Sequence, residues 1–203
     1  MIAIIDYGMG NLGSVQKALT FLGYESVISD RPETANSATG LILPGVGAIS
    51  SAMDSLKEKK LDGLVRDYVA TGRPFLGICL GMQMLFDDSD EYGPDGQVVR
   101  GLGILSGSVR RFPGDMGLKV PQIGWNDLTY VAHDDLRAGD YVYFVHSYYC
   151  VPALRENIAA TAVYGIEYAA AAKKDNVLGV QFHPEKSGEV GLAILNRWAR
   201  RTR

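Results

Sequence analysis

The segment Gly77-Ile78-Cys79-Leu80-Gly81 carries the strongest chemical signal in the sequence. It follows an apolar stretch and opens a helical pattern, as the G-x-S-x-G nucleophile elbow does, with sulfur in place of oxygen. The flanking glycines permit a strained turn that pushes the Cys79 side chain out at the end of a strand. The start of a helix favours negative charge, so we expect a reactive thiolate there. Taken alone, the motif also fits a buried structural cysteine.

A second segment, Val180-Gln181-Phe182-His183-Pro184-Glu185, can supply the base that such a nucleophile needs. Pro184 disfavours helix at the preceding residue and keeps His183 extended. Residues two apart in an extended chain face the same side, so Glu185 can reach one imidazole nitrogen of His183. The other nitrogen is then free to take a proton, as in a triad of nucleophile, base and orienting acid. The segment also ends an apolar strand, where open α/β sheets place their sites.

Strand and helix patterns alternate in the part of the chain that must position these groups. Strand patterns occur at 2–6, 25–29, 40–43 and 74–78. Helical patterns occur at 12–22 and 80–86, and residues 48–68 contain one or two helices. Further strand-like pieces follow at 109–112, 128–131, 141–145, 158–163, 168–172 and 177–182, and a last helix at about 189–201. This order predicts an α/β fold, a flavodoxin-like three-layer sandwich with a mostly parallel central sheet and added antiparallel strands. Because the sequence contains no linker or repeat, we expect one domain over residues 1–203.

With the nucleophile first and His-x-Glu near the end, the chain resembles the class I, or triad, glutamine amidotransferases. Gly-Ile-Cys-Leu-Gly-Met-Gln and Phe-His-Pro-Glu match the two signatures of that family, and the resemblance spans nearly the whole chain. It implies that Cys79 is the nucleophile, His183 the base and Glu185 its orienting acid. The implied enzyme hydrolyses the side-chain amide of glutamine to glutamate and ammonia through a cysteine thioester.

The same resemblance implies the residues that surround glutamine. The backbone N–H groups of Leu80, Val46 and Gly47 are the expected oxyanion donors, because the glycines of the 44–47 loop permit an amide to turn into the site. The residues expected to hold the amino-acid part of glutamine are Gly45, Gln83, Ser147 and Tyr148. Without the resemblance, these positions also fit a plain turn, a helix-surface glutamine and a strand end.

A set of segments is similar to the glutaminase subunits of imidazole glycerol phosphate synthase, which act in histidine biosynthesis. These segments are 6–12, 44–47, 120–126, 146–149 and 183–187. The similarity implies a heterodimer with a (β/α)₈-barrel cyclase that receives the ammonia. The candidate docking residues are Asn11, Trp125, Asn126, Tyr143 and Lys186.

Composition limits the other classes of partner and site. The net charge of −3 argues against sequence-independent binding to nucleic acid. The longest apolar runs fall short of the roughly 18 residues that span a bilayer, and no signal-peptide pattern is evident, so we expect a cytoplasmic protein. Two cysteines make no disulfide framework, and Cys150 is expected to be an inert thiol. We expect no metal and no cofactor, and His133 in a solvated turn. His146 can either orient the glutamine loop or pack at a strand end, and of these we favour packing.

Rival functions remain open at the level of sequence. Gly8-Met9-Gly10-Asn11-Leu12-Gly13 fits the G-x-G-x-x-G pattern, and Asp30 lies near the end of the second strand, as in an NAD-dependent dehydrogenase. That function leaves the cysteine elbow and His-Pro-Glu without a role. A cysteine peptidase or γ-glutamyl hydrolase could use the same triad. A sister amidotransferase subunit, for anthranilate or pyridoxal phosphate synthesis, is a further alternative, against which Gly-Trp-Asn and His-Ser-Tyr-Tyr argue.

Overall fold

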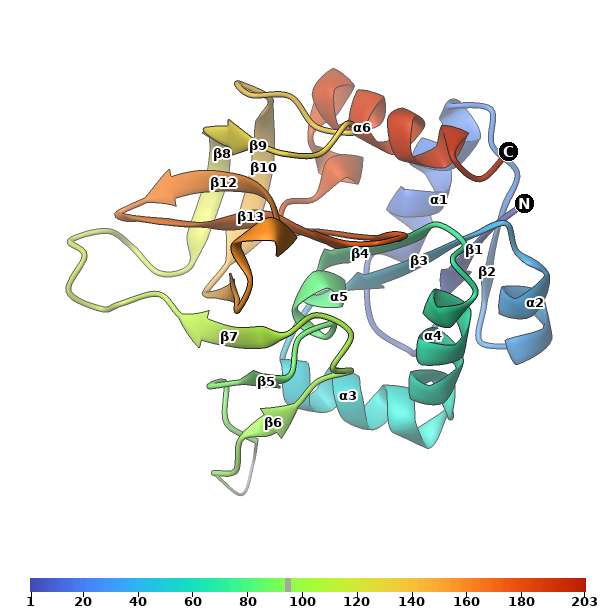
Figure 1. Ribbon diagram of the computed structural model, residues 1–203, viewed down its shortest axis with the longest axis horizontal. Helices are drawn as coiled ribbons and strands as arrows, with labels where there is room; N and C mark the ends of the chain where they lie inside the picture. The colour runs from blue at the N-terminus through green and yellow to red at the C-terminus, as the bar shows by residue number, and fades with distance from the viewer. Residues whose placement is uncertain (94–95) are drawn as a thin grey trace.

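The computed structural model describes residues 1–93 and 96–203, and parallel strands form the centre of its fold (Figure 1). Their order in the sheet is β2-β1-β3-β4-β14. Their bounds are β1 (Ile2–Ile5), β2 (Ser26–Ser29), β3 (Gly40–Gly45), β4 (Phe75–Cys79) and β14 (Val177–Val180). Since β4 and β14 are hydrogen-bonded neighbours, the two segments with chemical signals leave the sheet side by side.

Helices cover both faces of this parallel part. On one face lie α1 (Leu12–Phe21) and α6 (Gly188–Arg200), and on the other α2 (Pro32–Ser37), α3 (Ile49–Glu58) and α4 (Leu61–Ala70) (Figure 1). The strands feed both cores because successive side chains alternate in direction. In β1, for example, Ile2 and Ile4 pack with α1 and α6, whereas Ala3 and Ile5 pack with α3 and α4.

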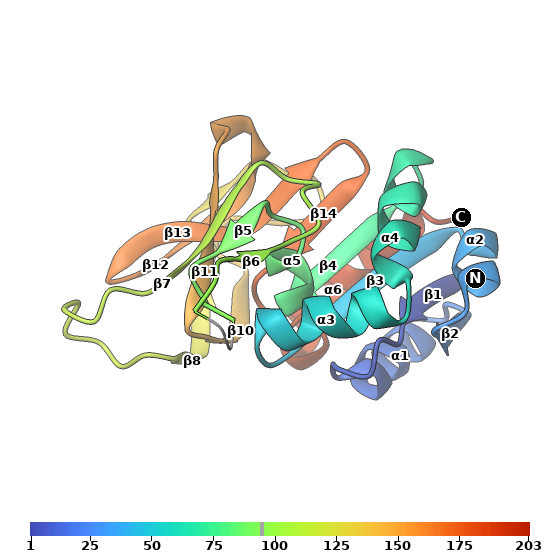
Figure 2. The same cartoon turned by 90° about the horizontal axis from the view of Figure 1, so that it is seen from below.

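A second, mostly antiparallel group of strands extends the sheet beyond β14 (Figure 2). It comprises β13 (Ile166–Lys174), β11 (Tyr148–Pro152), β7 (Gly107–Arg111), β5 (Asp88–Ser89), β6 (Val99–Arg100), β12 (Ile158–Tyr164) and β9 (Tyr130–Val131). A separate ribbon pairs β8 (Gln122–Asp127) with β10 (Tyr141–His146). The short helical turns are α5 (Leu80–Gln83), η1 (Arg155–Asn157) and η2 (Pro184–Lys186). The predicted α/β fold with added antiparallel strands is therefore confirmed.

Of two predicted helical spans, the one at 48–68 contains two helices, within the expected one or two, and the one at 80–86 forms a shorter helix than expected. The pattern at 48–68 is divided between α3 and α4 by Lys60, whose φ of 57° is left-handed. The pattern at 80–86 gives only the single turn of α5. There the carbonyls of Met84 and Leu85 accept N–H groups from Leu102 and Ile104, at 2.7 and 2.9 Å. Within the predicted span, the N–H groups of Leu85 and Phe86 donate three residues back, to Met82 and Gln83, in place of the four-residue bonds of an α-helix.

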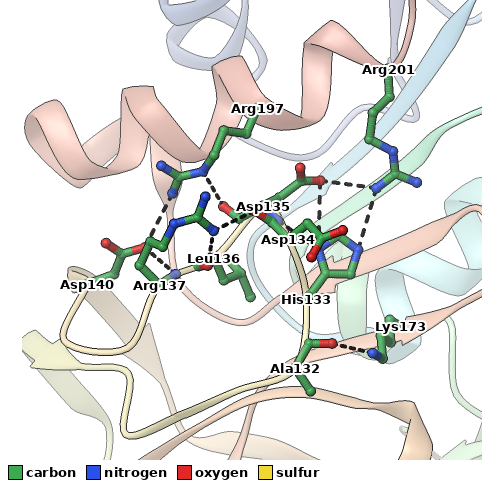
Figure 3. Close-up of polar contacts among 10 residues, drawn as sticks. All are labelled: Ala132, His133, Asp134, Asp135, Leu136, Arg137, Asp140, Lys173, Arg197 and Arg201. Carbon is green, nitrogen blue, oxygen red and sulfur yellow. Dashed lines mark hydrogen bonds and ion pairs between the residues drawn. The ribbon is translucent and has the colours of Figure 1, made fainter.

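The loop between β9 and β10 is fastened to the C-terminal end of α6 by a partly buried polar cluster (Figure 3). Arg197 Nε donates to the backbone oxygen of Asp135 at 2.7 Å, and Arg201 Nη1 pairs with Asp135 Oδ2 at 3.1 Å. His133 Nδ1 lies 3.8 Å from the same carboxylate oxygen, and burial lowers the pKa of His133. The expected turn is present, but it is not solvated at His133, whose side chain is only 13% exposed. Arg197 in α6 and Arg201 just after it hold this loop against the helix.

We predict that Asp135→Asn lowers the free energy of unfolding by about 1–2 kcal/mol, because Arg201 loses its charged partner in a partly buried site. Urea unfolding monitored by circular dichroism measures the change. Asp134→Asn is the matched control, since the Asp134 side chain is exposed. Equal stability of the two variants would contradict the role given to the Asp135 carboxylate.

Candidate active site

Cys79 lies at the carboxyl end of β4 in a conformation that L-residues rarely adopt, with φ 53° and ψ −109°. The flanking glycines are required by contact. A Cβ on Gly77 would lie 2.8 Å from the oxygen of Gly81, and a Cβ on Gly81 would overlap the oxygen of Leu43. A strained residue of this kind costs about 1–3 kcal/mol and persists because its surroundings hold it. The elbow anticipated from the sequence is present, and it directs the sulfur away from the sheet.

A cavity of about 350 Å³ lies beside this elbow and brings together segments that are far apart in the sequence. Its lining residues are Val46, Gly47, Cys79, Leu80, Gln83, Glu91, Pro121, Val145, His146, Ser147, Tyr148 and His183. The cavity thus contains the expected nucleophile and base, the expected oxyanion residues, and three of the four residues expected to bind glutamine. The fourth, Gly45, lies under the cavity wall, where a Cβ would be 2.8 Å from Leu80 Cβ.

His183 and Glu185 form a buried pair behind the cavity. Nδ1 of His183 lies 2.9 Å from Oε1 of Glu185, and the two side chains are 2% and 1% exposed. Burial alone lowers the pKa of His183, but the Cys79 sulfur and the Glu185 carboxylate outweigh it and raise the pKa to about 9. Nε2 has no hydrogen-bond partner among the described residues. This nitrogen is therefore available for proton transfer beside the sulfur.

The 44–47 loop is held against the elbow by Tyr7. The buried Tyr7 hydroxyl donates to the oxygen of Pro44 at 2.9 Å, and burial raises the pKa of Tyr7, so the hydroxyl keeps its proton. Gly47 has a φ of 97°, which its missing side chain permits. Tyr7 was missed at the level of sequence, because nothing in the local pattern shows that its hydroxyl reaches a loop 37 residues away.

Gln83 is a cavity residue and not a helix-surface residue. Only 5% of it is exposed, and its Nε2 donates to the oxygens of Tyr148 and Gln181, at 3.0 and 3.1 Å. Gln181 and Glu91 were missed. Gln181 lies two residues before His183 in the segment 180–185. Because residues two apart on an extended chain share a face, this spacing could have identified Gln181 as a neighbour of the site. Glu91 lies among the acidic residues of a long loop, where sequence gave no means to distinguish it.

His146 packs at the end of β10 as expected and also anchors a carbonyl at the cavity. Its ring lies 5.1 Å from that of Phe112, and its Nδ1 donates to the oxygen of Tyr148 at 2.8 Å. Burial lowers the pKa of His146 to about 4, so the ring is neutral at pH 7.

The expected docking residues do not all lie on one surface. Trp125 is 46% exposed and stacks on Tyr141 at 5.8 Å, and Tyr143 lies beside it at 6.1 Å. Lys186 lies in η2, which packs against β10 and α1. Asn11 immediately precedes α1. Asn126 alternates to the other face of β8, where its amide donates to the oxygen of Val163 at 2.8 Å.

Comparison with known proteins shows the family to which the chain belongs. Residues 3–200 match the family model "Glutamine amidotransferase class-I", and the chain belongs to this family. A solved glutamine amidotransferase structure matches with a TM-score of 0.74 at 19% identity, covering 100% of this chain and 99% of that one. A glutamine amidotransferase structure from Thermotoga maritima matches with a TM-score of 0.70 at 17% identity, covering 99% and 96%. At such identities these structures show the fold alone.

Curated relatives narrow the assignment. The chain is 50% identical to the imidazole glycerol phosphate synthase subunit HisH of Geobacillus thermodenitrificans, over 98% of this chain and 94% of that protein. It is 48% identical to the subunit of the same name from Syntrophotalea carbinolica, over 98% of each chain. The chain therefore belongs with the HisH subunits, in agreement with the resemblance seen in its sequence.

The G-x-G-x-x-G pattern has a structural explanation that needs no dinucleotide. Gly8 and Gly10 have φ values of 92° and 116°. Residues with a side chain rarely adopt such φ values, so the backbone of the turn after β1 explains these two glycines. The dehydrogenase alternative is thus unsupported. Among the described residues, no helix is both long enough and apolar enough to cross a membrane.

The low pKa of His146 predicts a pH-dependent stability. The pKa of His146 is about 6.5 in the unfolded chain and about 4 in the folded protein. The neutral ring therefore contributes fully to the free energy of unfolding above pH 6.5, and this contribution is lost as the pH falls toward 4. The loss amounts to about 3 kcal/mol over that window. The free energy of unfolding, measured with urea at pH 7 and pH 4.5, should therefore fall less for His146→Gln than for the wild type, because glutamine does not titrate in this range. Parallel declines in the two proteins would refute the assignment.

Proposed function

We propose that the chain hydrolyses the side-chain amide of glutamine, with Cys79 as nucleophile, His183 as base and acid, and Glu185 as its orienting carboxylate. One observation carries the proposal. The strained elbow and the carboxylate-paired imidazole, distant in sequence, line one cavity. Membership of the class I amidotransferases supplies the substrate class.

The raised pKa of His183 suits the order of proton transfers. His183 takes the thiol proton of Cys79, and the thiolate so formed attacks the amide carbon of glutamine. His183 then gives its proton to the leaving nitrogen, the C–N bond breaks, and ammonia departs from a γ-glutamyl thioester. Neutral His183 next takes a proton from water while the oxygen of that water attacks the thioester. The C–S bond breaks, glutamate leaves, and the ion pair is restored.

The negative oxygen of each tetrahedral intermediate needs fixed donors. We assign this role to the backbone N–H groups of Leu80, Val46 and Gly47, because these residues line the cavity around the sulfur. Tyr7, by holding the oxygen of Pro44, keeps the loop in place for this task.

The remaining cavity residues suit the amino-acid end of glutamine. Both N–H groups of the Gln83 amide are engaged inside the protein, so its oxygen can only accept a bond from the substrate. Glu91 offers a carboxylate at the cavity, held by the N–H of Ile49 at 3.0 Å, and suits the α-ammonium group. Ser147, Tyr148 and Gly45 complete the proposed binding set.

The relatives are named as subunits of imidazole glycerol phosphate synthase. By analogy, this chain assembles with a (β/α)₈-barrel cyclase subunit in the cytoplasm and passes ammonia to it for histidine biosynthesis. The exposed Trp125, with Tyr143 and the nearby Lys186 and Asn11, forms the proposed docking face. Asn126 supports this face from behind by holding β8 to β12.

Ammonia release from glutamine tests the nucleophile. Wild-type protein with the cyclase subunit should release ammonia rapidly, and Cys79→Ala should be slower by at least about 1,000-fold, because no acyl intermediate can form. Cys150→Ala is the matched control and should keep most of the activity, since Cys150 is buried in β11 and burial raises its pKa. Release by Cys79→Ala at the rate of the wild type would end the proposal.

Binding measurements test the docking face. Trp125→Ala should weaken the affinity for the cyclase at least about tenfold, since exposed aromatic anchors dominate interfaces. Tyr130→Ala, which removes another half-exposed aromatic on β9, should bind like the wild type. Isothermal titration calorimetry measures the affinity of both variants for the cyclase. Unchanged affinity of Trp125→Ala would show that Trp125 is not part of the interface.

A further inference from the structure

A buried row of side-chain amides connects the sulfur of Cys79 to the backbone of β11. Gln181 Nε2 donates to Cys79 Sγ at 3.6 Å, and Gln181 Oε1 accepts from Gln83 Nε2 at 3.1 Å. Gln83 Nε2 also donates to the oxygen of Tyr148 at 3.0 Å. The whole of Gln181 is buried, so water does not compete for these bonds.

The carbonyl of Tyr148 determines the direction of every bond in this row. A carbonyl oxygen can only accept, so Gln83 must present its amide nitrogen there. The second N–H on that nitrogen meets Gln181, which must therefore present its oxygen. The amide nitrogen of Gln181 is left facing the sulfur. The opposite orientation of Gln181 would place two nitrogens against each other.

Both ends of the row are fixed by the fold. The oxygen of Tyr148 is also held by Nδ1 of the neutral His146, at 2.8 Å. The backbone N–H of Gln181 donates to Ala170 of β13 at 2.8 Å, just beyond the end of β14. Gln181 therefore cannot turn away from the sulfur without breaking bonds that no solvent replaces.

We propose that Gln181 is a catalytic residue that stabilises the thiolate form of Cys79 through its side-chain N–H, and that Gln83 sets its orientation. A donor to the charged form of an acid favours that form, most strongly where water is excluded. Gln83 is thus both a substrate contact and a positioning residue for Gln181. The inference rests on the proposed role of Cys79 as the nucleophile.

Alkylation by iodoacetamide across pH 4–9 tests the inference without glutamine or a partner. Mass spectrometry of peptides separates the Cys79 reaction from that of Cys150. Gln181→Leu should move the midpoint of the Cys79 pH profile upward by about one unit, and Gln181→Glu further, since a carboxylate opposes the negative sulfur. Gln16→Leu, on the distant side of α1, should match the wild type. Wild-type midpoints in both Gln181 variants would overturn the inference.

A second pair of variants tests the orienting role. Gln83→Leu should shift the midpoint in the same direction but less, and Gln83→Leu combined with Gln181→Leu should match Gln181→Leu alone, because both act through one bond. Fully additive shifts would show that Gln83 acts on the sulfur by another route and would overturn the orienting role.

Wild-type protein gives an independent answer if Gln181 variants do not fold, as judged by circular dichroism. The side-chain amide signals of Gln181 in ¹⁵N spectra of the full chain should move as Cys79 titrates, and static signals would overturn the inference. If the Gln181 variants show the wild-type pH profile of Cys79 alkylation while Cys79→Ala is inactive, this inference alone is overturned. If Cys79→Ala releases ammonia from glutamine like the wild type, the proposed function is overturned instead.

Discussion

The steric fit between the elbow and β3 is the constraint on which the rest of the site depends. Gly81 packs so tightly against the carbonyl of Leu43 that no side chain fits, and Gly77 packs in turn against Gly81. These contacts force the left-handed φ of Cys79, which lifts the sulfur out of the sheet into the cavity. The strain at one residue is maintained by the buried cores on both faces of the sheet.

Around this sulfur, the proposed base, His183, is held by a different part of the molecule. The backbone N–H of His183 donates to Tyr143 at 2.9 Å, and Ser187 joins the two segments by receiving the N–H of Tyr143 and donating to the oxygen of His183. The base is therefore tied to β10, the strand that carries part of the proposed docking face. A partner that shifts this ribbon would act on the base through backbone bonds, which gives docking a direct physical route to the chemistry.

Local sequence patterns were sufficient for the features that depend on neighbours in the chain. The glycines at 77 and 81 predicted the elbow, Pro184 predicted the extended His183, and strand–helix alternation predicted the parallel sheet. Features that depend on distant contacts were missed. Tyr7, Glu91 and the direction of the Gln181 amide are defined by segments far away in the sequence. The burial of His133 was missed for the same reason, since it depends on Arg201, which follows α6, 68 residues along the chain from His133, and which contacts both His133 and Asp135.

The central claim is that glutamine is cleaved through a covalent bond to one sulfur. Rapid acid quenching of the protein during turnover with glutamine and the cyclase subunit, followed by peptide mass spectrometry, tests it most directly. We predict a γ-glutamyl group on the peptide that contains Cys79. Ammonia formed in the same quenched sample with no acyl group on that peptide, or with the group on another residue, would contradict it.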